Sequence, residues 1–128
     1  MTDHAELARR FFGAIEQGDA AKVADCYTPD ATIWHNYDDA TQTRDENVAV
    51  LSGFVGRTRE RRYTEAKLTV WDGGFAQQHV LVATSKGGAV LRLPAALFCD
   101  VRDGRIVRLR EYFDPAPVEA WRRDPQFA

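Results

Sequence analysis

The chain of 128 residues has little cysteine and no long uninterrupted hydrophobic run. Its two cysteines, Cys26 and Cys99, lie far apart and lack the paired spacing of a zinc site or a redox motif, so we expect both to be reduced and buried. No stretch reaches the roughly 20 apolar residues that a membrane-spanning helix needs. The first residues also lack the apolar centre of a signal peptide. These absences predict a cytoplasmic protein that does not enter a membrane.

The chain also lacks an excess of positive charge. Lysine and arginine number 17 against 19 for aspartate and glutamate, which gives a formal net charge of −2. Such a balance provides no general attraction for a phosphate backbone, so we expect no nucleic-acid partner. The spacings of a P-loop, a GxGxxG fingerprint, a GxSxG elbow and a His-x-x-x-His metal site are missing as well. The sequence therefore predicts neither a metal ion nor a cofactor.

Apolar residues first recur at the three- and four-residue spacing of helices. Thr2 or Asp3 can cap a first helix, and Gly18 ends it. Asp19 can cap a second, shorter helix that breaks at Pro29. The chain is therefore predicted to open with a helical hairpin.

A strand and a third helix come next. Residues 31–37 combine β-branched and aromatic side chains between turn-forming residues, which predicts a strand. After a polar turn, Thr43 or Asp45 can cap a helix that ends at Gly56. A short helical turn is expected near the C-terminus, at residues 115–123.

The second half of the chain has the pattern of long strands joined by tight turns. The predicted strands are residues 59–72, 75–85, 89–103 and 105–114. Pro94 indicates a bulge or a bend within its strand. Because consecutive hairpins make antiparallel neighbours, and because the helices precede them, we predict an α+β fold with helices on one face of the sheet.

This order of elements resembles the nuclear transport factor 2-like superfamily, specifically its SnoaL-like and ketosteroid-isomerase-like branch. The string FFGAIEQGDAAKVADCYTPDATIW is similar to the opening hairpin and first strand of that branch, and VRDGRIVRLREYFD is similar to its final hairpin. The resemblance covers residues 1–128 and implies a single SnoaL-like domain. It also implies a cystatin-like α+β roll, in which a cone-shaped, curved antiparallel sheet is covered by three N-terminal helices. The mouth of the cone would hold a small, mostly apolar molecule.

Ketosteroid isomerases use a carboxylate base on the first strand, a tyrosine on the first helix and a protonated aspartate near the centre of the sheet. The positions of this chain that match by motif spacing are His35, Phe11 and Phe98. Both oxyanion donors are therefore missing, and the base is of another type. We do not expect the steroid double-bond isomerase reaction.

Limonene-epoxide hydrolases are similar to the chain at two other places. The string WHN at residues 34–36 matches a first-strand motif that holds a water, and REYFD at residues 110–114 matches a closing string with the carboxylate base. That family also has an Arg-x-Asp pair on a middle strand, where this chain has His79 and Leu81. The resemblance thus implies a carboxylate base, whereas the general acid of that family is absent or replaced in this chain.

The alternation of side chains on the first strand leaves two arrangements open. Ile33, His35 and Tyr37 share one face of the strand, whereas Trp34 and Asn36 share the other. Only one of the two sets can line the cone, and a one-residue bulge would exchange them.

Two further residues complete a candidate acid–base set. Glu111 lies on the more apolar face of its strand, where loss of water favours a base that works near neutrality, although an ion pair with Arg92 would make it structural. His79 lies on a middle strand and could face the same cavity as His35.

We therefore predict a cofactor-independent acid–base enzyme of the isomerase, dehydratase or epoxide hydrolase type, acting on an apolar cyclic or polyketide-like molecule. The predicted catalytic residues are His35, Asn36, His79 and Glu111. The predicted ligand-binding residues are Phe12, Trp34, Phe54, Leu93, Phe98 and Phe113. The resemblance implies a homodimer formed through the sheet. Two alternatives remain, a non-catalytic dimer that binds a hydrophobic ligand and a protein-interaction module.

Overall fold

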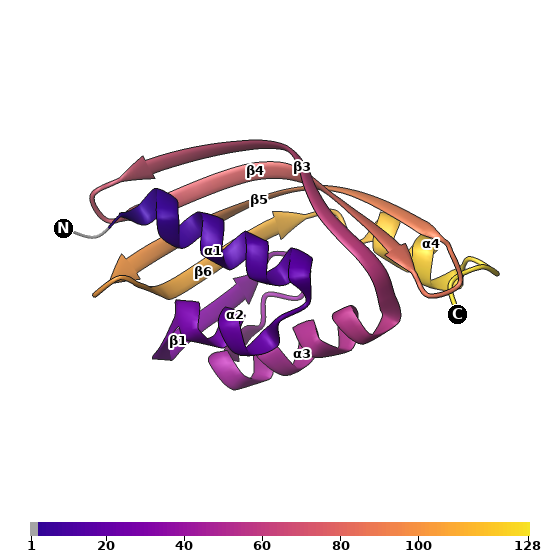
Figure 1. The fold of residues 1–128 in the computed structure, drawn as a ribbon, viewed down its shortest axis with the longest axis horizontal. Coiled ribbons are helices and arrows are strands. Elements are labelled where there is room, and N and C mark those ends of the chain that lie inside the picture. The colour runs from indigo at the N-terminus through magenta and orange to yellow at the C-terminus, as the bar shows by residue number, and fades with distance from the viewer. Residues whose placement is uncertain (1–2) are drawn as a thin grey trace.

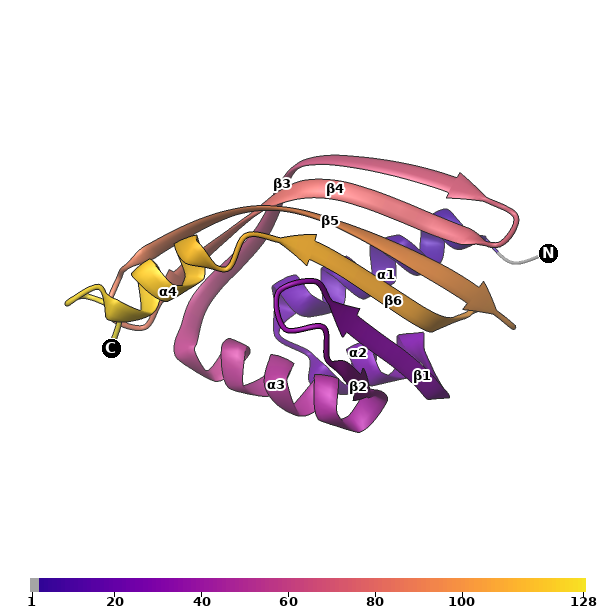
Figure 2. The same cartoon turned by 180° about the vertical axis from the view of Figure 1, so that it is seen from behind.

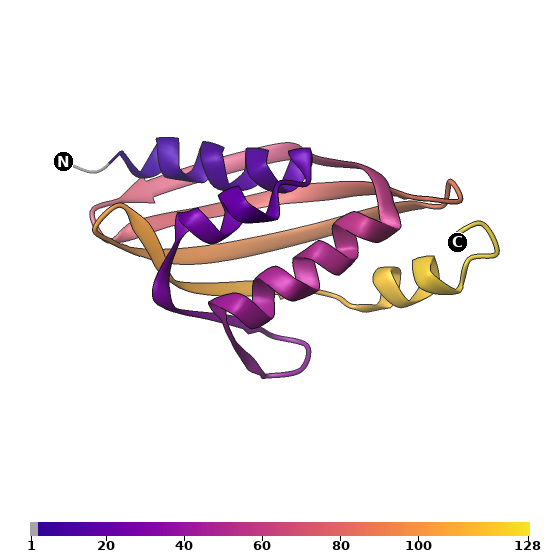
Figure 3. The same ribbon diagram turned by 60° about the horizontal axis from the view of Figure 1, so that its bottom comes forward.

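The computed structural model describes residues 3–128, in which one curved sheet is covered by helices on its concave face (Figure 1). The helices are α1 (His4–Gln17), α2 (Ala20–Cys26), α3 (Arg44–Arg57) and α4 (Ala116–Arg123). The strands are β1 (Tyr27–His35), β2 (Thr41–Thr43), β3 (Thr58–Trp71), β4 (Gly74–Ser85), β5 (Val90–Arg102) and β6 (Arg105–Phe113). Figure 3 shows α1, α2 and α3 over the same face, which confirms the predicted α+β class. None of these helices is long and apolar enough to cross a membrane.

Side-chain caps and a glycine set the ends of the first two helices. Asp3 accepts a hydrogen bond from the backbone N–H of Glu6 and so caps α1. Gly18 ends that helix in the left-handed conformation, with a φ of 73°, which glycine adopts without steric cost. Asp19 caps α2. These ends agree with the sequence prediction, except that Thr2, the other N-cap considered, lies outside the described residues.

The apolar face of α1 packs against the sheet and forms the main core. Phe11 lies edge-on to Tyr27, with 5.6 Å between ring centroids, in a cluster of buried apolar side chains. Such pairs add to the free energy gained by hydrophobic burial. Cys26 and Cys99 are both buried in this core and form no disulfide, as expected.

The strands follow the order β2-β1-β6-β5-β4-β3 across the sheet (Figure 2). Strands β3 to β6 form the antiparallel meander that the sequence predicts. Strand β1, however, runs parallel to β6, so the sheet is not antiparallel throughout. The reason is topological, because the chain leaves β1 through α3, enters the meander at the far edge and returns beside β1 in the same direction.

Two prolines behave differently from their sequence predictions. Pro29 does not separate α2 from the following strand, because β1 already begins at Tyr27. The register between β1 and β6 shifts between Tyr27 and Thr32, so Pro29 lies in a stretch where its missing N–H breaks no regular ladder. Pro94 lies in a continuous β4–β5 register opposite Val80, so of the two predicted features, a bulge or a bend, the bulge is absent.

Helix α3 lies over the concave face, yet it has no fully buried residue. Its start is fixed by a capping box, in which Thr43 accepts from the backbone N–H of Glu46 and Glu46 accepts from the backbone N–H of Thr43. The helix ends at Arg57, one residue beyond the predicted stop at Gly56. Its apolar side chains Val48, Leu51 and Phe54 are only partly buried against the core, so the cap is expected to make a measurable contribution to its stability.

We predict that Thr43→Ala lowers the free energy of unfolding by about 1 kcal/mol, because the cap of α3 is lost. Urea unfolding followed by circular dichroism measures this change. Thr41→Ala is the matched control, since Thr41 is an exposed residue of the same strand and should change stability by less than about 0.5 kcal/mol. Equal losses in the two variants would contradict a role for the capping box.

Candidate active site

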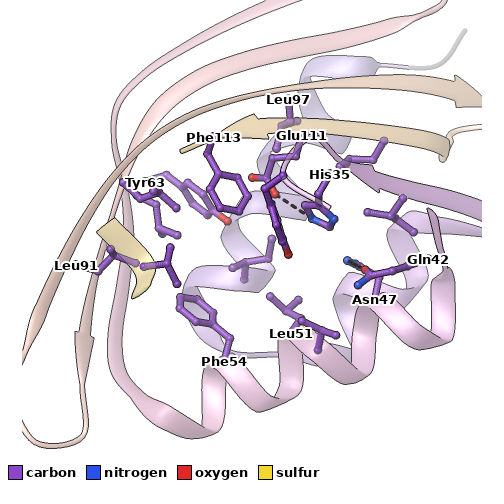
Figure 4. Close-up of a pocket in the computed structure, with 18 of the residues that line it drawn as sticks. His35, Gln42, Asn47, Leu51, Phe54, Tyr63, Leu91, Leu97, Glu111 and Phe113 are labelled. Atoms are coloured by element: carbon purple, nitrogen blue, oxygen red, sulfur yellow. Dashed lines mark hydrogen bonds and ion pairs between the residues drawn. The ribbon is translucent and has the colours of Figure 1, made fainter. Parts of the chain in front are cut away.

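A cavity of about 200 Å³ lies between the concave face of the sheet, α3 and α4 (Figure 4). Much of its wall is apolar: Leu51, Phe54, Leu81, Leu91, Leu93, Val118 and Trp121. In Figure 4, Phe54 and Leu91 lie toward one end, which we term the apolar end. His35, Gln42 and Asn47 lie toward the other, which we term the polar end. Tyr37, Tyr63 and Arg122 also line the cavity.

His35 and Glu111 form the centre of the polar end. Because β1 and β6 pair with these two residues opposite each other, both side chains point to the concave face. His35 Nε2 lies 3.3 Å from Glu111 Oε1, a distance from which a small side-chain movement permits proton exchange. The side chains are 12% and 24% exposed, respectively, so the pair is shielded from bulk water but open to the cavity.

The second ring nitrogen of His35 is not fixed by the protein. Nδ1 is buried and has no hydrogen-bond partner within residues 3–128. Since no such partner sets the tautomer, Nε2 can carry a proton toward Glu111 or accept one. The imidazole is thus suited to exchanging a proton with the carboxylate.

Two tyrosines line the cavity near this pair and keep their protons. Burial first, and the negative charge of Glu111 second, raise the pKa of the Tyr63 phenol. Burial also raises the pKa of Tyr27, with smaller contributions from Cys99 and then Glu111. Both phenols therefore stay protonated, so each can donate a hydrogen bond and neither is a base.

A short hydrogen-bonded chain lies at the same end of the cavity. Tyr27 Oη donates to Asn47 Oδ1 at 3.0 Å, and Asn47 Nδ2 donates to Gln42 Oε1 at 3.0 Å. All three residues line the cavity. This chain joins β1, α3 and β2, and it adds neutral donors beside the His35–Glu111 pair.

The other two predicted catalytic residues lie outside the cavity. Asn36 follows the last residue of β1, and its Oδ1 accepts a hydrogen bond from the backbone N–H of Phe113. His79 is 5% exposed, and its Nδ1 lies 3.0 Å from Gln77 Nε2. The structure therefore brings together only His35 and Glu111 of the predicted set.

The predicted ligand-binding residues divide in the same way. Phe54, Leu93 and Phe113 line the cavity, whereas Phe12, Trp34 and Phe98 do not. Phe12 turns into the core, where its ring lies edge-on to Tyr63 and His79, and the neighbouring Phe11 lines the cavity instead.

Trp34 and Phe98 belong to the convex face of the sheet. Trp34 Nε1 donates to Asp39 Oδ1 at 2.7 Å, and Phe98 is 40% exposed. Phe98 lies an odd number of positions from Leu93, and the register of β5 is continuous between them, so the two side chains must point to opposite faces. The position that matches the isomerase aspartate by spacing is therefore outside the cavity.

The predicted site residues omit six polar residues of the cavity: Tyr27, Tyr37, Gln42, Asn47, Tyr63 and Arg122. Gln42 was assigned to a polar turn, because a three-residue edge strand such as β2 has too few residues to show alternation. Asn47 lies one position before the apolar stripe of α3, a position where sequence alone gives it no special role.

Comparisons with known proteins show which family the chain belongs to. Residues 8–109 match the SnoaL-like domain. The chain belongs to the SnoaL-like family. An uncharacterised protein of Mycobacterium tuberculosis is 31% identical over 135 residues, which cover 94% of this chain and 98% of that protein. An uncharacterised protein of Mycobacterium bovis matches to the same extent.

Solved structures of low sequence identity share the fold of this SnoaL-like protein. A protein of Catenulispora acidiphila with a ketosteroid isomerase-like fold, solved with trimethylamine, has a TM-score of 0.80 at 17% identity and covers 98% of this chain and 97% of its own. IdmH of Streptomyces antibioticus, a candidate polyketide cyclase, has a TM-score of 0.78 at 17% identity and covers 93% and 97%. AclR of Streptomyces galilaeus, a candidate hydroxylase, has a TM-score of 0.80 at 15% identity and covers 92% and 96%.

The buried side chain of His79 is expected to make the stability of the fold depend on pH. Burial lowers the pKa of His79 from 6.5, and the charge of Glu111 opposes this shift more weakly. Below pH 6.5 the unfolded chain binds a proton that the folded chain does not, so stability is lost as the pH falls. We expect His79→Gln to flatten the fall in unfolding free energy between pH 7 and pH 5, by up to about 1.4 kcal/mol per pH unit.

Urea titrations at several pH values measure this slope in both proteins. The comparison isolates His79, because the carboxylates are common to the two chains. Parallel pH profiles would show that His79 is not the group responsible.

Proposed function

We propose that this SnoaL-like protein is a cofactor-independent acid–base enzyme that moves a proton on a small apolar ring compound. The observation that carries the proposal is the His35–Glu111 pair, with 3.3 Å between Nε2 and Oε1, at the polar end of a mostly apolar cavity. Apolar walls exclude water and strengthen the interactions of the few polar groups with a bound molecule. Such an arrangement suits proton transfer at carbon or at a bound oxygen.

The proposed reaction begins at the carboxylate. Glu111 removes a proton from a carbon next to a carbonyl group, and the electron pair of the C–H bond forms an enolate. Glu111 then holds the proton, and His35 Nε2 can take it up where Nδ1 carries the ring proton and leaves the lone pair of Nε2 free. Return of the proton to another carbon gives an isomer, whereas its delivery to a departing hydroxyl group gives an unsaturated product and water.

Structural neighbours support a substrate of this kind. They include candidate polyketide cyclases, a candidate isomerase and a candidate hydroxylase, and the proposed substrate class is correspondingly cyclic or polyketide-like. A cytoplasmic location, the absence of a metal or cofactor and the absence of a nucleic-acid partner remain predictions from the sequence.

We predict that Glu111→Gln and His35→Ala each lower turnover by roughly 10²-fold or more, because each removes a proton-transfer group. Cyclohexanone, cyclohexenone and cyclohexene oxide serve as probes. Deuterium uptake from deuterium oxide and epoxide opening are followed by mass spectrometry. Arg92→Gln is a control, since Arg92 pairs with Glu65 on the surface and does not line the cavity.

A non-catalytic ligand-binding protein is the second candidate. The observation in its favour is that the cavity has phenylalanine, Phe11, where the matched isomerase position carries a tyrosine donor. Binding of the same probes without turnover, and with affinity unchanged in the Glu111 and His35 variants, would support this candidate and overturn the enzyme proposal.

We also propose that two copies of the chain pair through the convex face of the sheet. Phe98 and Tyr112 are 40% and 43% exposed there, and their rings lie 6.0 Å apart, with Trp34 5.3 Å from Tyr112. An exposed aromatic group of this kind is typical of the centre of an interface.

Phe98→Glu is expected to convert the dimer to a monomer, because a charge would be buried at the centre of the interface without a partner. Analytical ultracentrifugation measures the change. Val50→Glu, an equally drastic change on α3, should leave the dimer intact. A wild-type protein that sediments as a monomer at high concentration would contradict this assembly.

A further inference from the structure

The hydrogen bonds from Tyr27 to Asn47 and from Asn47 to Gln42 run in one direction, because the surroundings of Tyr27 decide which group donates. They start at Tyr27, which is 1% exposed and therefore cannot turn its hydroxyl group to bulk water. Within residues 3–128, the hydroxyl has one hydrogen-bond partner, the side-chain oxygen of Asn47 at 3.0 Å. Because an unsatisfied buried donor is costly, the phenol must donate to an acceptor at this place.

The donor at Tyr27 fixes the orientation of both amides. Asn47 must present Oδ1 to the phenol, so its Nδ2 points the other way and donates to Gln42 Oε1 at 3.0 Å. Gln42 in turn must present its oxygen to Asn47. The amide nitrogen of Gln42 is thus the last donor in this row of hydrogen bonds. Within residues 3–128, that nitrogen donates to no other group.

The register of the sheet places this donor beside the catalytic pair. Gln42 of β2 lies opposite Ile33 of β1, and His35 is the next residue of β1 on the same face. Diagonal neighbours on adjacent antiparallel strands are about 7–8 Å apart, a spacing that one small ring or a few bonds can bridge. A single ligand can therefore reach Gln42 with one atom and the His35–Glu111 pair with another.

We propose that Gln42 is a positioning residue that donates a hydrogen bond to a carbonyl oxygen of the ligand, with Asn47 and Tyr27 holding its amide in the donating orientation. The ligand class is accordingly a small ring compound that carries a carbonyl group at the end facing β2. This assignment rests on the proposed function only in taking the cavity as the ligand site. It adds a donor that would hold the oxygen while Glu111 acts on a neighbouring carbon.

The opposite reading is that Gln42 merely joins the short edge strand β2 to α3 through Asn47. The two readings differ in what the ligand must contain. A structural glutamine would affect all ligands alike, whereas a donor to the ligand affects only those with an acceptor oxygen. The test therefore compares ligands that have the same shape with and without that oxygen.

The experiment measures dissociation constants by NMR titration for cyclohexanone and methylenecyclohexane, and for decalone and its methylene analogue. We expect Gln42→Met to weaken ketone binding by roughly three- to tenfold while binding of the methylene analogues is unchanged or tighter. Tyr27→Phe should reduce the ketone preference by a smaller factor, because both amides can then turn over. Gln78→Met, on the exposed face of β4, is the control and should change neither ligand.

Glu111→Gln separates this inference from the proposed function. If Gln42 binds the oxygen, the ketone preference persists in that variant even where turnover is lost. Equal losses of affinity for the ketone and for its methylene analogue in Gln42→Met would overturn the inference. A wild-type protein that binds ketone and analogue with equal affinity, or that binds no ketone, would also overturn it. If the preference depends on Gln42 but Glu111→Gln leaves turnover unchanged, the proposed catalytic role fails and this inference stands.

Discussion

The register between β1 and β6 decides which side chains meet on the concave face of the sheet. With His35 opposite Glu111 and Ile33 opposite Leu109, the imidazole and the carboxylate lie above an apolar floor. A slip of one residue would turn Trp34 inward and move His35 to the convex face. The irregular stretch after Tyr27 absorbs the mismatch between the two strands, so it sets this register and with it the chemistry of the cavity.

Local signals in the sequence were sufficient for most of the fold. Asp3, Gly18 and Asp19 act on neighbouring backbone groups, and the glycine-containing turns of the meander join strands that are adjacent in the chain. The pairing of β1 with β6 joins segments about 75 residues apart, and no local signal reports it. The sequence therefore did not decide which face of the sheet His35 occupies, and it did not indicate that β1 runs parallel to β6.

Two of the three errors in the predicted ligand set, Trp34 and Phe98, have one physical origin. Leu93 and Phe98, like Trp34 and His35, differ by an odd number of positions within one strand, so each pair can share a face only through a bulge. Pro94 suggested such a bulge, but β5 keeps its register through that residue. Alternation alone would have placed Phe98 on the convex face with its neighbour Tyr112.

Burial, with a smaller contribution from the charge of Glu111, decides which groups at the polar end keep their protons. The carboxylate of Glu111 contributes to keeping the Tyr27 and Tyr63 phenols protonated, and burial does the larger part. Neither phenol can therefore accept a proton from a ligand. Tyr27 donates a hydrogen bond to Asn47, and Asn47 donates one to Gln42. Of the groups gathered there, only the imidazole of His35 and the carboxylate itself can both take and return a proton. The same burial that creates an array of fixed donors thus leaves the acid–base step to one pair.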